Sequence, residues 1–148
     1  IERALEISGI TREDIKKFGS PGEGYNAILK IFNKYIDKYS KNDKFVVCAY
    51  NAKFDIDFLT QFFIKNGNNF LFSYFGEIKD PLSIIRYFSA LGKIKTENKR
   101  LGTICKYFRI KLGKAHDASA DVEATRKLDK KLGNIFSKCI DGGINETT

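Results

Sequence analysis

Residues 44–59 read KFVVCAYNAKFDIDFL and contain a change from one hydrophobic period to another. The segment 44–50 is a short, nearly continuous apolar run with β-branched residues, which is typical of a strand buried on both faces. Over residues 55–66 the apolar side chains return at helical spacing, and Gly67 stands where a C-terminal glycine is expected. A strand followed at once by a helix predicts an α/β unit, with Asp55 near the strand end where ligand sites collect.

Two helices are predicted before this strand. Thr11 and Asp14 have the spacing of a capping box, which predicts a short helix over residues 11–18, ended by the turn at residues 19–22. The apolar residues of 27–39 recur at steps of three and four, and lysines occupy the other side. This period predicts a second, amphipathic helix.

The later part of the chain continues the alternation of strands and helices. Residues 70–78 are aromatic and partly alternating, which predicts a second strand, and Asp80-Pro81 has the pattern of a helix cap followed by a first-turn proline. Further helices are expected over residues 81–92, 101–108 and 118–136, and a turn at residues 141–143. The fold class predicted from this order is α/β.

Length and composition limit the kind of protein. The 148 residues fit one domain, which we place at residues 1–140 with a tail at 141–148. The 26 basic and 18 acidic residues give a net charge of +8, which favours an anionic partner, although the even spread of the lysines is equally typical of a solvated surface. The three cysteines lack the spacing of a metal knuckle, and no apolar run is long enough to span a membrane. A cytoplasmic protein without a membrane partner is expected.

Two carboxylates occupy positions that a purely structural helix does not require. In the last helix Asp121 begins the face that continues with Ala124 and Leu128, so a carboxylate is predicted to point inward, where it needs a cation. His116 lies just before this helix. The structural alternatives are a helix cap by Asp117 with His116 exposed and Asp121 half-solvated and, for Asp55, an ordinary role at a helix N-terminus.

Two patterns of residues relate the chain to a known family. An Asn-x-x-Phe-Asp core followed by Phe-Leu is formed by Asn51, Phe54, Asp55, Phe58 and Leu59. A histidine followed five residues later by an aspartate is formed by His116 and Asp121. In this order the patterns resemble the second and third motifs of the DEDD group of 3′→5′ exonucleases, in its His-type, DnaQ-like branch. This group has the ribonuclease-H-like fold of the polymerase III epsilon proofreading subunit, a mixed sheet flanked by helices.

The resemblance implies a metal-dependent nuclease that removes nucleotides from the 3′ ends of single-stranded DNA or RNA, in some relatives beside a DNA polymerase. By resemblance, Asp121 and Asp55 would bind two Mg²⁺ or Mn²⁺ ions, and His116 would take the proton from the attacking water. Asn51, Phe54 and Thr11 would contact the substrate. Basic residues at 93–100 and 126–131 could follow a single strand, or could simply form solvated helix faces.

One departure from the family pattern lies near the beginning of the chain. The first motif of the family, Asp-x-Glu on the first strand, has no counterpart before Gly9, and the three strands expected there are missing as well. Together with the absence of Met, this predicts that the sequence is the later two-thirds of the domain and that the chain alone is inactive or nearly so. The alternative is a catalytically inactive, nuclease-derived module that binds nucleic acid or a polymerase.

Overall fold

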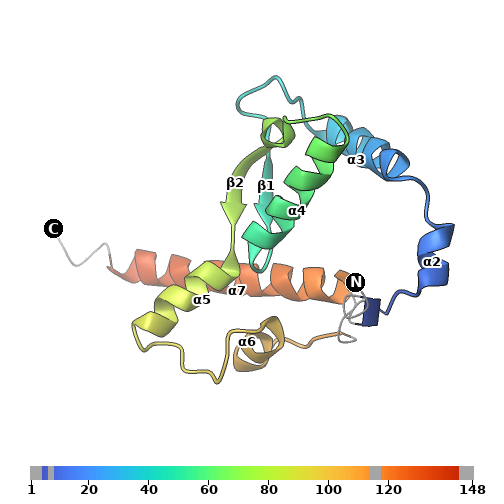
Figure 1. Ribbon diagram of the computed structural model, residues 1–148. Coiled ribbons are helices and arrows are strands. Elements are labelled where there is room, and N and C mark those ends of the chain that lie inside the picture. Colours follow the sequence, from blue (N-terminus) through green and yellow to red (C-terminus); the bar gives the residue numbers. More distant parts are fainter. Residues whose placement is uncertain (1–4, 7–8, 114–117, 144–148) are drawn as a thin grey trace. The chain divides into compact units, whose positions relative to one another are not determined.

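A computed structural model describes residues 5–6, 9–113 and 118–143 of the chain (Figure 1). Its elements, in chain order, are α2 (Arg12–Lys17), α3 (Pro21–Tyr35), β1 (Phe45–Cys48), α4 (Ala52–Lys65), the 3-10 helix η1 (Leu71–Ser73), β2 (Phe75–Lys79), α5 (Pro81–Ala90), α6 (Leu101–Tyr107) and α7 (Ala118–Gly143). They fall into two compact units, the first made of residues 1–47 and 52–78 and the second of residues 48–51 and 79–148. The mixture of helices and strands confirms the predicted α/β class.

The strands β1 and β2 form a two-stranded sheet. The Phe45 N–H donates to the Tyr74 carbonyl at 2.8 Å and the Ala49 N–H to the Lys79 carbonyl at 3.2 Å, so both strands advance in the same direction and are parallel. The predicted strand at residues 70–78 is correct only in its second half, because the 3-10 helix η1 occupies residues 71–73 and β2 begins at Phe75.

The burial of β1 differs from the prediction of a strand buried on both faces. Phe45 and Val47 are partly buried, whereas Val46 is 51% exposed. In the described part of the chain, the aromatic side chains of α3 and α4 cover only one face of the strand, and this one-sided packing gives the alternation. Strand β1 is thus a half-exposed strand.

Aromatic rings form the core of the first unit. The Phe32 ring of α3 lies 5.2 Å from the Phe45 ring of β1 and 6.2 Å from the Phe63 ring of α4, measured between ring centroids. It also lies 5.2 Å from Tyr74 and 5.8 Å from Phe75. Stacked, tilted and edge contacts of this kind stabilise aromatic clusters, so one side chain joins both helices to both strands.

Helix α3 ends earlier than its hydrophobic period predicts. Ser20 caps it as part of a capping box, and the helix stops at Tyr35. The Asp37 N–H then donates to the Asp43 carboxylate at 2.7 Å, and the Tyr39 N–H to the Asp37 carboxylate at 3.0 Å. Because these side chains take the place of helical carbonyls, the backbone leaves the helix although the apolar spacing continues.

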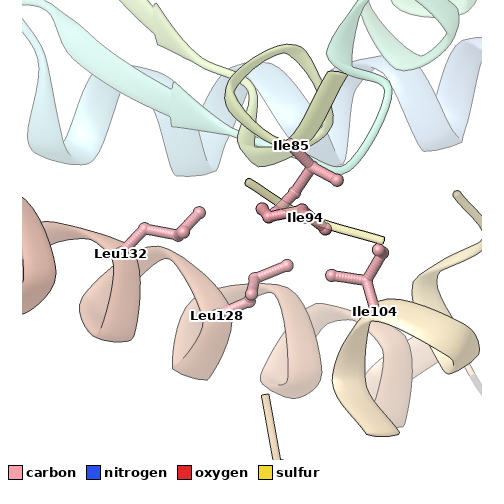
Figure 2. Close-up of a cluster of buried hydrophobic side chains, with 5 residues drawn as sticks. All are labelled: Ile85, Ile94, Ile104, Leu128 and Leu132. Carbon is pink, nitrogen blue, oxygen red and sulfur yellow. The ribbon is translucent and has the colours of Figure 1, made fainter. Parts of the chain in front are cut away.

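Five apolar side chains from three helices and one loop form the core of the second unit: Ile85 of α5, Ile94 of the loop, Ile104 of α6, and Leu128 and Leu132 of α7. Figure 2 shows these side chains pointing toward one another. Both α5 and α6 pack against α7 (Figure 1). The predicted apolar face of α7 is confirmed for its buried members, which are Ala124, Thr125, Leu128 and Leu132.

Helix α7 extends further than the sequence predicted. It continues from Ala118 to Gly143, so the turn expected at residues 141–143 is helical instead. Despite this length, none of the helices in the described ranges is both long and apolar enough to cross a membrane.

Candidate active site

The turn after β1 is held by one carboxylate. Asn51 has a φ of 69°, a left-handed conformation that asparagine tolerates better than most residues. Its N–H donates to Asp80 Oδ1 at 3.0 Å. The same carboxylate caps α5, since Oδ1 accepts from the Leu82 N–H at 2.9 Å and Oδ2 from the Ser83 hydroxyl at 3.2 Å. Asp80 therefore fixes both the turn that leads into α4 and the start of α5.

Asp55 lies in the first turn of α4, three residues after its beginning at Ala52. Its side chain is exposed, and in the described residues no hydrogen bond or ion pair engages the carboxylate. On the same helix Phe54 and Phe58 are 68% and 66% exposed, while Ile56 is buried. The helix thus presents an uncommitted carboxylate beside two solvent-facing rings.

Asp121 occupies the first turn of α7. The prediction that it points inward is wrong, because its side chain is exposed and the buried face begins one turn later at Ala124. Its negative charge nevertheless acts on a buried group, the Cys105 thiol. Burial first, and the Asp121 charge second, raise the pKa of the Cys105 thiol.

His116 lies outside the described residues, but the structure describes the chain that approaches it. A Cβ atom built on Gly113 would lie 2.9 Å from the Ala120 Cβ of α7. This distance is closer than two carbon atoms tolerate, so residue 113 must be a glycine to lie this close to α7. The sequence analysis missed Gly113, because its role depends on this contact.

Thr11 has a structural role. Its hydroxyl accepts from the Asp14 N–H at 3.1 Å and donates to the Asp14 carboxylate at 2.7 Å, which completes the predicted capping box of α2. The hydrogen bonds from Thr11 lower the pKa of Asp14. The hydroxyl of Thr11 is thus engaged within its own helix cap.

Tyr50 joins the end of β1 to the first basic stretch. Its hydroxyl donates to the Lys99 carbonyl at 2.6 Å. Burial raises the pKa of Tyr50 to about 12, and the nearby Cys105 and Asp80 act in the same direction. The phenol is therefore neutral and serves as a donor over the whole physiological pH range.

Several cations of the second basic stretch have partners within the chain. Arg126 donates from Nε and Nη2 to the Glu123 carboxylate at 2.7 and 2.9 Å, and Lys127 lies 3.4 Å from it. The hydrogen bond from Arg126 is the main reason why the pKa of Glu123 falls to about 2. Lys131 donates to the Phe108 carbonyl at 2.6 Å. These partners favour the interpretation of residues 126–131 as a solvated helix face over the interpretation as a surface that binds a nucleic-acid strand.

The described residues supply candidate metal ligands but no assembled metal centre. Among them, no group of three or more His, Cys, Asp or Glu side chains could hold an ion. Asp55 and Phe54 belong to the first unit, and Asp121 and Asn51 belong to the second. The exposed carboxylates of Asp55 and Asp121, which no described side chain engages, have the oxygen chemistry that Mg²⁺ and Mn²⁺ prefer.

Comparison with known proteins adds independent information. Residues 1–128 match the family model of the RNase T exonucleases. The DNA polymerase III PolC-type of Halalkalibacterium halodurans is 33% identical over 124 residues, which make up 84% of this chain. The matched region spans 8% of the length of that relative. No solved structure matches the chain.

The role of Asp80 can be measured by unfolding in urea. Asp80→Ala should lower the free energy of unfolding by about 2 kcal/mol, roughly half from the lost helix cap and half from the lost bond to Asn51. Asp80→Asn keeps an acceptor oxygen for both N–H groups and should lose much less. Equal losses in the two variants would contradict the assigned role.

The pKa of Tyr50 predicts an alkaline transition. In the unfolded chain the phenol titrates near its ordinary value of 10.0, and in the folded protein at about 12. The stability that the neutral phenol contributes is therefore complete below pH 10 and is lost as the pH rises to about 12. Titration by tyrosinate absorbance should lose its component near pH 12 in Tyr50→Phe, and an unchanged titration curve would refute the assignment.

Two glycines allow a matched test of the contact before His116. Gly113→Ala should destabilise the protein by about 1–3 kcal/mol, because the new methyl group overlaps Ala120. Gly133→Ala, in the interior of α7 with open space around it, should instead stabilise by roughly 0.5–1 kcal/mol. Thermal unfolding measures both, and effects of the same sign would argue against the close approach.

Proposed function

Because the chain belongs to the exonuclease family, we propose that it serves as a metal-dependent 3′→5′ exonuclease that removes nucleotides from the end of a DNA or RNA strand. The DnaQ-like resemblance read from the two motifs is confirmed by the family match and by the PolC-type relative. The observation that carries the finer proposal is that each motif presents an exposed carboxylate, Asp55 or Asp121, which no described side chain engages.

The proposed mechanism assigns one task to each motif residue. Asp121 and Asp55 would hold two divalent ions, Mg²⁺ or Mn²⁺, by the oxygen ligands that such ions prefer. When bound, the ions supply charge stabilisation for the phosphodiester and lower the pKa of the attacking water. His116 would accept the proton of that water, a reaction suited to an imidazole with an ordinary pKa near 6.5.

The substrate contacts proposed from the motifs involve residues of different kinds. Phe54 offers an exposed ring beside Asp55, and aromatic rings stack on unpaired bases of either nucleic acid. Asn51 has an exposed side chain that is available to the substrate, and Asp80 binds only the backbone N–H of this residue. We assign Thr11 a contact to the strand as well, although its hydroxyl is engaged in the α2 cap.

The partner and compartment proposed for the nuclease follow from the relative and the cysteines. A PolC-type polymerase contains a region similar to this chain, so we propose proofreading beside a DNA polymerase as its setting. Cys48 and Cys105 are free thiols, which fits the reducing cytoplasm.

A second candidate function is a nuclease-derived module that binds nucleic acid or a polymerase without cleaving. It is favoured by one observation of the described residues: no group of three or more His, Cys, Asp or Glu side chains among them could hold an ion, whereas a two-metal site needs several carboxylates. The two candidates differ in one measurable property, which is cleavage of the bound strand.

Cleavage of a 3′-labelled single strand in Mn²⁺ tests the proposal, with the natural polypeptide that carries residues 1–148. His116→Ala and Asp55→Asn should each slow release of the label by at least about 100-fold, because proton transfer or metal binding is lost. Asp57→Asn is the matched control. Asp57 is exposed on the same helix but paired with Lys53 at 2.5 Å, so its variant should cleave normally.

Circular dichroism must show that all three variants remain folded. Equal cleavage by the wild type, His116→Ala and Asp55→Asn would refute the assigned roles. Tight binding of the strand by the wild type without any release of label would favour the binding module.

A further inference from the structure

The second unit contains an apolar cleft that the proposed nuclease chemistry does not use. It has a volume of about 300 Å³ and lies where the ends of α5 and α6 meet α7. The residues that line it are Phe88, Ile94, Tyr107, Phe108, Leu132, Ile135 and Phe136. All of these side chains are apolar or aromatic, and the Tyr107 hydroxyl is the single polar group among them.

The cleft has a buried floor and an open mouth. Ile94 and Leu132 are 8% and 4% exposed, whereas Tyr107 and Ile135 are 45% and 42% exposed. The floor belongs to the core of the unit shown in Figure 2, so its shape is fixed by packing. A rigid apolar recess with exposed rings at its mouth has the features of a pocket for a side chain of a partner.

The segments that line the cleft carry many cations. Every charged residue within two sequence positions of a lining residue is a cation with an exposed side chain: Arg86, Lys93, Lys95, Lys106, Arg109, Lys130, Lys131 and Lys138. Lys131 is fixed at the rim by its hydrogen bond to the Phe108 carbonyl. The nearest acidic residues along the sequence are Glu97 and Asp129, each three positions from a lining residue, and Asp129 lies 4.0 Å from Lys79.

We propose that this cleft docks an acidic peptide segment of a partner protein, with an aromatic or leucine side chain of the peptide inserted between α5, α6 and α7. The cations on these segments, Lys131 among them, supply charge complementarity, which speeds encounter and selects an anionic partner. The apolar recess supplies the anchor that gives such interfaces most of their affinity.

Nucleic acid is also anionic, but it fits the recess less well. A nucleobase carries several hydrogen-bonding groups, and the lining offers only the Tyr107 hydroxyl to satisfy them. Burial of those groups without partners is costly, whereas an aliphatic or phenyl side chain carries no such groups. The lining therefore favours a peptide over a base.

Fluorescence polarisation with the natural polypeptide that carries residues 1–148 tests the proposal. The probe is a labelled peptide of about twelve residues, built from Asp and Glu with one Phe and two Leu at the spacing of one helix face. A matched peptide has Ala in place of the three apolar residues, and an oligothymidylate strand serves as the nucleic-acid probe. The apolar peptide should bind at least tenfold more tightly than its Ala counterpart.

Two tyrosines of the second unit provide matched variants. Tyr107 lines the cleft, and Tyr87 does not, yet both are exposed and both make an edge contact with the phenylalanine that follows them. Tyr107→Ala should weaken peptide binding by about tenfold or more, while Tyr87→Ala should leave it unchanged. Lys131→Glu should weaken binding, in contrast to Lys30→Glu on α3.

The remaining outcomes are equally decisive. Equal binding of the two peptides would show attraction by charge alone and would overturn the proposal. Stronger binding of the oligothymidylate, lost in Tyr107→Ala, would assign the cleft to nucleic acid instead. If Tyr107→Ala does not fold, Ile135→Gln replaces it, because it puts a polar group at the exposed mouth, and unchanged peptide binding by this variant would also refute the proposal.

Discussion

The bond between the Asp80 carboxylate and the Asn51 N–H is the constraint on which the geometry of the motif around Asn51 and Asp55 depends. Parallel strands have no tight hairpin to keep their ends in register, so the segments after them need their own anchors. Asp80 provides one, because a single side chain caps α5 and holds the left-handed residue after β1. The motif that contains Asp55 therefore begins from a fixed turn.

The sequence predicted those features whose signals are local. Residue 80 was expected to cap a helix and Gly67 to end one, and the structure confirms both, with a φ of 77° at the glycine. It did not predict the bond between Asn51 and Asp80, which joins residues 29 positions apart. The early end of α3 was missed for a related reason, because it depends on the carboxylates of Asp37 and Asp43 and not on hydrophobic spacing.

The candidate site was predicted largely by resemblance. Motif spacing led to the prediction of Asp55, Asp121 and His116 without any knowledge of their surroundings. Helical periodicity wrongly placed Asp121 inside, because a face that is buried along most of a helix can be exposed in its first turn. The close approach of Gly113 to Ala120 could not be read from spacing, since it arises from packing between separate segments.

The direction of digestion tests the exonuclease proposal most directly. A single strand labelled at its 5′ end is incubated in Mn²⁺ with the natural polypeptide that carries residues 1–148, and the products are separated by length. Removal from the 3′ end predicts a ladder of labelled strands that shorten step by step. Immediate release of the labelled 5′ nucleotide, or cleavage only at internal positions, would contradict the account.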